Sequence, residues 1–163
     1  MIKFKFWFSK NYWWLFIGLV FTLIIFASFY EPFRRINAIV AVLTILVSTL
    51  FFIQKQKLEE LKIFIKLFKA FNNRYDKLND DLNIITDKTE PLNDKEKQKL
   101  YDYFNLCGEE YFYYKQGYIP PEVWESWLNG MKFFYKNSKI QKLWDEELGL
   151  NSYYKFKKSL LEN

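Results

Sequence analysis

The chain has 163 residues, with 24 Lys and Arg against 19 Asp and Glu, a single cysteine and no histidine. One cysteine excludes an intrachain disulfide framework and suits a reducing compartment. The lack of histidine excludes His-dependent catalytic triads, Cys-His dyads and histidine zinc sites.

Positive charge is concentrated in the first half of the chain. Residues 1–79 carry 12 Lys or Arg against 4 Asp or Glu, a net +8, whereas residues 80–163 carry 12 against 15, a net −3. Cationic residues beside a bilayer are attracted by anionic lipid. The basic pI is therefore weak evidence for nucleic-acid binding, which we do not expect.

The first ten residues mix lysines with aromatic residues. Aromatic rings at headgroup level and lysines that extend toward phosphates are typical of a membrane interface. A secretory signal peptide is disfavoured, because the apolar run that follows is longer than a signal core of about 7–15 residues. The predicted interface anchors are Lys3, Lys5, Trp7, Lys10, Trp13 and Trp14.

Two uncharged apolar runs follow, residues 12–30 and 36–53, of 19 and 18 residues. Each is close to the ~20 residues that cross a bilayer as a helix. In hydrocarbon, backbone N–H and C=O groups must form their hydrogen bonds within their own segment, so we expect a transmembrane helical hairpin. Residues 1–53 form the predicted membrane anchor. The lysine-rich flanks outweigh Arg34 and Arg35 in the connection, so both termini are expected in the cytoplasm.

The second run contains small and polar residues along one helix face. Such residues let helices approach closely in lipid and can hydrogen-bond across the contact. Two interpretations stay open: packing within the hairpin, or a polar stripe that lines the axis of a homo-oligomeric pore. Since neither run holds an ionisable residue, an ion-coupled transporter is disfavoured. The stripe consists of Asn37, Ala41, Thr44 and Ser48.

Residues 54–82 have apolar residues at helical spacing and a lysine-rich opposite face, which predicts an amphipathic stalk helix. Residues 83–93 are predicted as a linker. Residues 94–163 form the predicted cytoplasmic helical domain, with helices at about 94–116, 121–136 and 139–148 and a last one from Asn151 or Ser152. Asn93 with Glu96 suggests a capping box, and Ser138 is the expected cap of the third helix. The predicted fold class is therefore all-α.

Three residues in the first of these helices could carry chemistry. Cys107 lies on the apolar stripe near carboxylates that oppose thiolate formation, so it is expected in the core. Glu109 and Glu110 could perform acid–base work, or one could be buried against a cation or Tyr and Trp donors. A di-metal carboxylate site, even if the acidic residues 145–147 met these glutamates in space, would lack its usual histidines. We expect no metal, no cofactor and no enzymatic activity.

The segment YFNLCGEEYFYYKQGYIPPEVWESWLNGM (residues 103–131), with the later YKN and LWDEE, resembles the cytoplasmic domain of small uncharacterised bacterial membrane proteins. These proteins have two N-terminal spans, and some are labelled phage abortive infection proteins. The resemblance implies a bacterial inner-membrane location and a possible defence role, and it carries over no catalytic residue. The expected partners are the lipid bilayer and either sister subunits or an unknown protein.

Overall fold

The computed structural model describes residues 14, 17, 18, 20–22, 24, 25, 29 and 32–162. Every regular element in these residues is a helix, so the all-α prediction is confirmed for this part of the chain. In the first apolar run, the described residues between 14 and 25 are helical. The predicted anchors Lys3, Lys5, Trp7, Lys10 and Trp13 lie outside the described residues, whereas Trp14 is helical and exposed.

By its internal contacts the chain divides into two units, Met1–Lys62 and Ile63–Asn163. Helix α2 (Pro32–Asp87) contributes its first part to one unit and its second part to the other. It begins within the predicted connection 31–35, at a proline, which suits the first turn of a helix. Within residues 36–50 of the first unit, only Leu46 is buried.

The second part of α2 buries a regular apolar face in the second unit. Phe71, Leu78, Leu82 and Ile85 are buried at spacings of seven, four and three, the period that keeps one face of a helix toward its neighbours. Helix α2 ends at Asp87, five residues inside the segment predicted as a linker. The Asn and Asp residues there suggested a break, but the fully buried Leu82 and Ile85 continue the apolar face and hold the helix.

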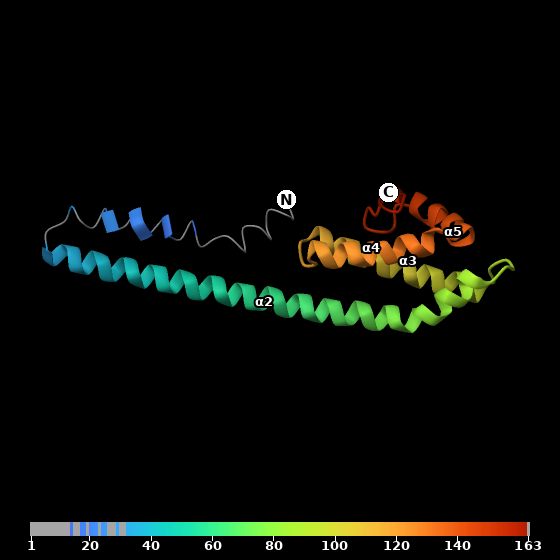
Figure 1. The fold of residues 1–163 in the computed structure, drawn as a ribbon, viewed down its shortest axis with the longest axis horizontal. Coiled ribbons are helices and arrows are strands. Elements are labelled where there is room, and N and C mark those ends of the chain that lie inside the picture. Colours follow the sequence, from blue (N-terminus) through green and yellow to red (C-terminus); the bar gives the residue numbers. More distant parts are fainter. Residues whose placement is uncertain are drawn as a thin grey trace. The chain divides into compact units, whose positions relative to one another are not determined.

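Three further helices complete the second unit: α3 (Asp94–Lys115), α4 (Pro121–Tyr135) and α5 (Ser138–Gly149). Figure 1 shows them beside one another, followed by the C-terminal segment. The predicted capping box is confirmed, since the Asn93 side chain accepts from the Glu96 amide and the Glu96 carboxylate accepts from the Asn93 amide. Gly117 has a φ of 77°, so it supplies the left-handed conformation that lets the chain leave α3.

The core of the second unit is rich in aromatic rings, which belong to nine of its twenty buried hydrophobic residues. The Trp144 ring lies 4.6 Å from that of Phe104 in a stacked pair, and it also contacts Tyr103, Tyr135 and Phe156. Both Trp144 and Phe104 are almost fully buried. Because one aromatic ring can bury about 150–250 Å², a few large side chains give this small unit a continuous core.

The N-terminus of α5 is capped by Asn137 and not by Ser138, which the sequence suggested. The Asn137 Oδ1 accepts from the amides of Lys139 and Ile140 at 3.1 and 3.4 Å. Its Nδ2 donates to the carbonyl of Thr86 at 3.0 Å, near the end of α2. One side chain therefore satisfies the first turn of α5 and joins it to α2.

The prediction of a last α-helix from Asn151 or Ser152 is wrong. Asn151, Tyr154 and Lys155 have φ values of 55°, 51° and 64°, which are incompatible with a right-handed helix. Only a short 3₁₀ turn, η1 (Lys158–Leu160), is present. Tyr153 and Phe156 are both buried. Their spacing of three residues therefore comes from a turn whose two side chains pack in the core, and not from one face of a helix.

Candidate functional site

The two predicted glutamates of α3 have separate environments. The Glu109 carboxylate accepts two hydrogen bonds from the Arg74 guanidinium of α2, at 2.5 and 3.2 Å, in a bidentate ion pair. The Arg74 side chain is 42% exposed and the Glu109 side chain 32%. Glu109 is therefore neutralised by a partner on another helix, and its role in the structure is to join α3 to α2.

Glu110, the next residue, faces the interior and is only 6% exposed. Burial raises the pKa of its carboxyl group from 4.5 to about 8, because the charged form loses hydration. The positive charge of Arg74 opposes this shift and the negative charge of Glu109 adds to it. At neutral pH the Glu110 carboxyl group is mostly protonated, although a modest change in its surroundings would ionise it.

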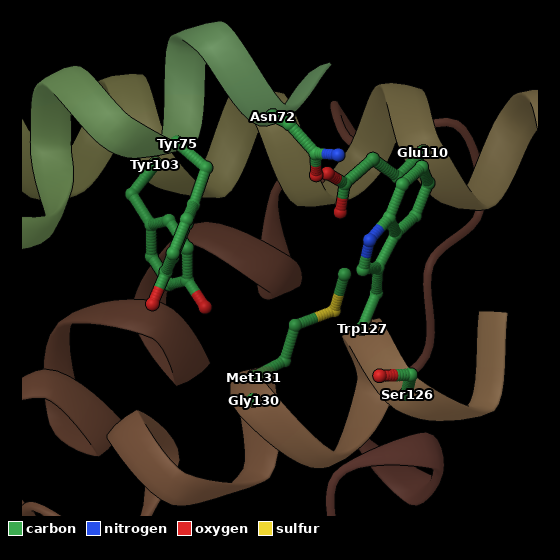
Figure 2. A pocket seen from close by; sticks show the side chains of 8 residues that line it. All are labelled: Asn72, Tyr75, Tyr103, Glu110, Ser126, Trp127, Gly130 and Met131. Atoms are coloured by element: carbon green, nitrogen blue, oxygen red, sulfur yellow. The ribbon is translucent and has the colours of Figure 1, made fainter. Parts of the chain in front are cut away.

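Glu110 lines a cavity of about 210 Å³ between α2, α3 and α4. The other lining residues are Asn72, Tyr75, Tyr103, Ser126, Trp127, Gly130 and Met131. Figure 2 shows Glu110 on the same side as Asn72 and Trp127, with the two tyrosines on the opposite side. Tyr103, Glu110 and Met131 are buried, whereas Ser126 and Gly130 are exposed, so the cavity opens beside α4.

Burial also acts on other polar groups in the cavity wall and behind it. Burial is the main cause that raises the pKa of Tyr103 and of Tyr75. Burial also raises the pKa of the Cys107 thiol well above its usual value, followed by the effect of the Glu110 charge. Because the thiolate is the nucleophile, Cys107 is a core residue, as predicted, and not a reactive thiol.

The acidic residues at the end of α5 make contacts of their own. Asp145 accepts from the Tyr135 hydroxyl at 2.7 Å and from the Lys158 amine at 2.8 Å. Glu147 accepts from the Tyr153 hydroxyl at 2.7 Å. The bond from Tyr135 joins α4 to α5, and the bonds from Tyr153 and Lys158 attach the C-terminal segment to α5. No group of three or more Cys, Asp and Glu side chains that could hold a metal occurs in the described part of the chain.

The proposed stripe of the second apolar run is exposed in the first unit: Asn37, Ala41, Thr44 and Ser48 all lie on the outside of α2. The Thr44 hydroxyl donates to the Val40 carbonyl of its own helix at 2.9 Å. A hydroxyl satisfied in this way needs no partner on another helix. Thr44 could therefore face lipid or a second helix at little cost.

Sequence reasoning missed the cavity, but one signal pointed to the ion pair beside it. Arg74 is the only arginine in residues 36–163, where every other basic residue is lysine. Arginine is preferred to lysine where a carboxylate is bound bidentately, which is the contact that Arg74 makes. No comparable signal marks Asn72 or Trp127 as cavity residues, since their positions depend on how three helices meet.

The described residues define a class of protein: an all-helical chain with one helix long and apolar enough to cross a membrane. The helical segment Ile36–Asp87 contains an 18-residue apolar window, only 6% of which is buried. No known family model matches the chain, and no curated protein or solved structure is significantly similar to it.

Proposed function

We propose that this chain is a non-enzymatic bacterial inner-membrane protein that presents a cytoplasmic helical interaction module. Residues 12–30 and 36–53 form its transmembrane hairpin, residues 54–87 continue α2 as an amphipathic stalk, and residues 94–163 form a cytoplasmic helical bundle. The observation that carries the proposal is the contrast within α2. Its apolar first part is exposed, with Phe51 at 70% and Val47 at 65%, whereas Phe71 in the second part is 3% exposed.

A lipid environment around the first part of α2 accounts for these exposed apolar side chains better than an aqueous environment does. Leaving apolar surface in water costs about 25 cal/mol per Å², and contiguous apolar patches beyond a few hundred Å² mark partner or membrane contacts. A run of 18 residues that contains no charge and is exposed over most of its length is typical of a membrane span. The lysines that follow at positions 55, 57, 62, 66 and 69 favour a cytoplasmic location for the residues after the span.

An interaction role is favoured over catalysis by the state of the candidate groups. Glu109 is neutralised by Arg74, and burial raises the pKa of the Cys107 thiol. In contrast, the rings of Phe112 and Tyr154 lie 5.4 Å apart and are 38% and 52% exposed. Exposed aromatic side chains are enriched where proteins bind partners, so this pair is the proposed contact surface.

The defence role rests on the resemblance of residues 103–131 to the cytoplasmic domain of small bacterial membrane proteins, some of which are labelled phage abortive infection proteins. It is tested by phage challenge of bacteria that express the wild-type chain or surface variants. Protection is expected from the wild type and from Phe133→Ser, a matched change at a separate exposed ring on α4. Protection should be lost in the double variant Phe112→Ser with Tyr154→Ser. Equal protection by all three chains would reject the proposed surface, and none from the wild type would reject the defence role.

A homo-oligomeric pore that permeabilises the membrane is the second candidate. It is favoured by the exposed face of Asn37, Ala41, Thr44 and Ser48. Changing Thr44 and Ser48 together to Leu should abolish ion flux through liposomes that contain the protein. Thr49→Leu is the matched control, since Thr49 is an exposed hydroxyl residue about 100° around the helix from Ser48. Flux that survives the double change would reject a pore lined by this face.

A further inference from the structure

The cavity around Glu110 combines a buried carboxyl group with aromatic walls. Glu110 lies on its inner wall with Tyr103 and Met131, while Tyr75 and Trp127 are half-buried at its sides. Among the described residues that line the cavity, none is basic. Electrostatics therefore oppose an anionic occupant and favour a cationic one, because the only ionisable charge that these walls can present is negative.

We propose that this cavity is a binding site for a small organic ammonium ion, held by the carboxylate of Glu110 and the faces of Tyr75, Tyr103 and Trp127. This site is separate from the proposed protein-contact surface and from the membrane span, and it adds ligand binding to the proposed function.

The shape and chemistry of the cavity fit this class of ligand. A volume of about 210 Å³ lies below the ~300–1,000 Å³ of pockets for drug-sized molecules, so the occupant is small. Aromatic faces attract cations within about 6 Å of the ring centroid. Asn72 and Ser126 add oxygen atoms to the cavity wall, which can accept from the N–H groups of a primary amine. A calcium ion is a poorer match, because it takes about six to eight oxygen ligands and Glu110 is the one carboxylate among the described lining residues.

Binding is linked to the protonation of Glu110. The pKa of this carboxyl group is about 8 in the free protein, and a bound cation favours the ionised form. Below pH 8 the ligand must therefore displace a proton, and its affinity falls by up to tenfold per pH unit.

The neighbouring titratable groups keep one charge state over the relevant range. On α2, the ion pair with Glu109 raises the pKa of Arg74, and burial raises that of Tyr75. On α3, burial raises the pKa of Tyr103 and of Cys107. The cavity residues of α4 are not titratable. Glu110 is therefore the group whose proton controls binding.

The test is isothermal titration of the full-length protein in a maltoside detergent, which carries no choline headgroup. The probes are methylammonium and tetramethylammonium chloride, with sodium chloride at the same ionic strength as the control. Saturable binding of at least one ammonium ion is expected at pH 9, with affinity about 90-fold lower at pH 6, because Glu110 must first lose its proton. No saturable binding by folded protein, equal binding of sodium, or an affinity independent of pH would overturn the proposal.

Two variants separate the site from general effects on folding. At pH 9, where the carboxyl group of the wild type is ionised, Glu110→Gln should weaken binding at least tenfold, and it should remove the pH dependence. Gly130→Leu should narrow the opening of the cavity, because Gly130 is an exposed lining residue and a Cβ there has open space around it. Gly149→Leu is the matched control, because its Cβ also has open space but lies outside the cavity. Near-ultraviolet circular dichroism confirms that each variant is folded. Unchanged binding by Glu110→Gln or by folded Gly130→Leu would refute the assignment.

Discussion

Replacing Glu110 with Gln should stabilise the protein, by an amount that grows with pH. The substitution removes a carboxyl group whose charged form is disfavoured by burial, and it keeps nearly the same shape. The pKa of Glu110 is raised from 4.5 to about 8 in the folded state. The folded protein therefore binds more protons than the unfolded chain between these pH values. The contribution of protonated Glu110 to the free energy of unfolding is therefore fully present below the unfolded pKa, and it is lost as pH rises toward the folded pKa.

The size of the effect follows from this shift. With an unfolded pKa of 4.5 and a folded pKa of about 8, the wild type loses about 1 kcal/mol by pH 5, about 3 kcal/mol by pH 7 and about 5 kcal/mol by pH 9. Glu110→Gln should escape most of this loss. The gain is reduced by any hydrogen bond that the amide leaves unmade, about 1 kcal/mol for a typical bond.

The assay is urea unfolding of the full-length protein in detergent at pH 5, 7 and 9, followed by near-ultraviolet circular dichroism. The matched control is Glu109→Gln at the adjacent position. It breaks the ion pair with Arg74, and it should destabilise by about 0.5–1 kcal/mol, because both partners are partly exposed to solvent.

The two neighbouring substitutions are therefore expected to have opposite signs at neutral pH. Two results would refute the claim that burial disfavours the charged form of Glu110. One is that Glu110→Gln destabilises the protein at pH 9, and the other is that its effect does not change with pH.

Two further substitution pairs test the helix contacts. Asn137→Ala should cost about 1–2 kcal/mol in urea unfolding, because it removes the cap of α5 and the bond to α2. Ser138→Ala should be within about 0.5 kcal/mol of wild type, since the cap is Asn137, and an equal loss from both would contradict this. Gly149→Ala should gain up to about 1 kcal/mol from helix propensity, measured as a higher midpoint of thermal unfolding. Gly108→Ala should gain less or lose stability, because its Cβ would lie 3.3 Å from the Tyr153 side chain; equal gains would contradict that contact.

Local signals in the sequence predicted a good part of the fold. The Asn93 and Glu96 spacing predicted a capping box that the structure contains, and Pro121 marked the start of α4. The placement of Cys107 on an apolar stripe predicted its burial. These features depend on residues within a few positions of one another, so hydrophobic periodicity and capping chemistry are sufficient to find them.

The features that sequence reasoning missed depend on contacts between distant segments. Whether Glu109 or Glu110 is buried depends on Arg74, 35 residues away. The C-terminal segment has the apolar spacing of a helix, but Asn151 and Tyr154 adopt positive φ values. Tertiary contacts hold that conformation, including the Tyr153 hydroxyl bond to Glu147.

The central claim, that residues 36–53 cross a membrane, is tested most directly by cysteine accessibility in intact and permeabilised cells. Single cysteines are introduced as Arg35→Cys, Leu43→Cys and Ser152→Cys, and the buried native Cys107 serves as the unreactive background. Leu43 is chosen because it lies about 100° around the helix from Thr44 and about 140° from Ser48, so a pore lined by their face would not expose it. With a membrane-impermeant maleimide, we expect labelling of position 35 in intact cells, of position 152 only after permeabilisation, and of position 43 in neither case. Ready labelling of position 43 by the aqueous reagent would contradict a lipid environment for this segment and with it the proposed membrane anchor.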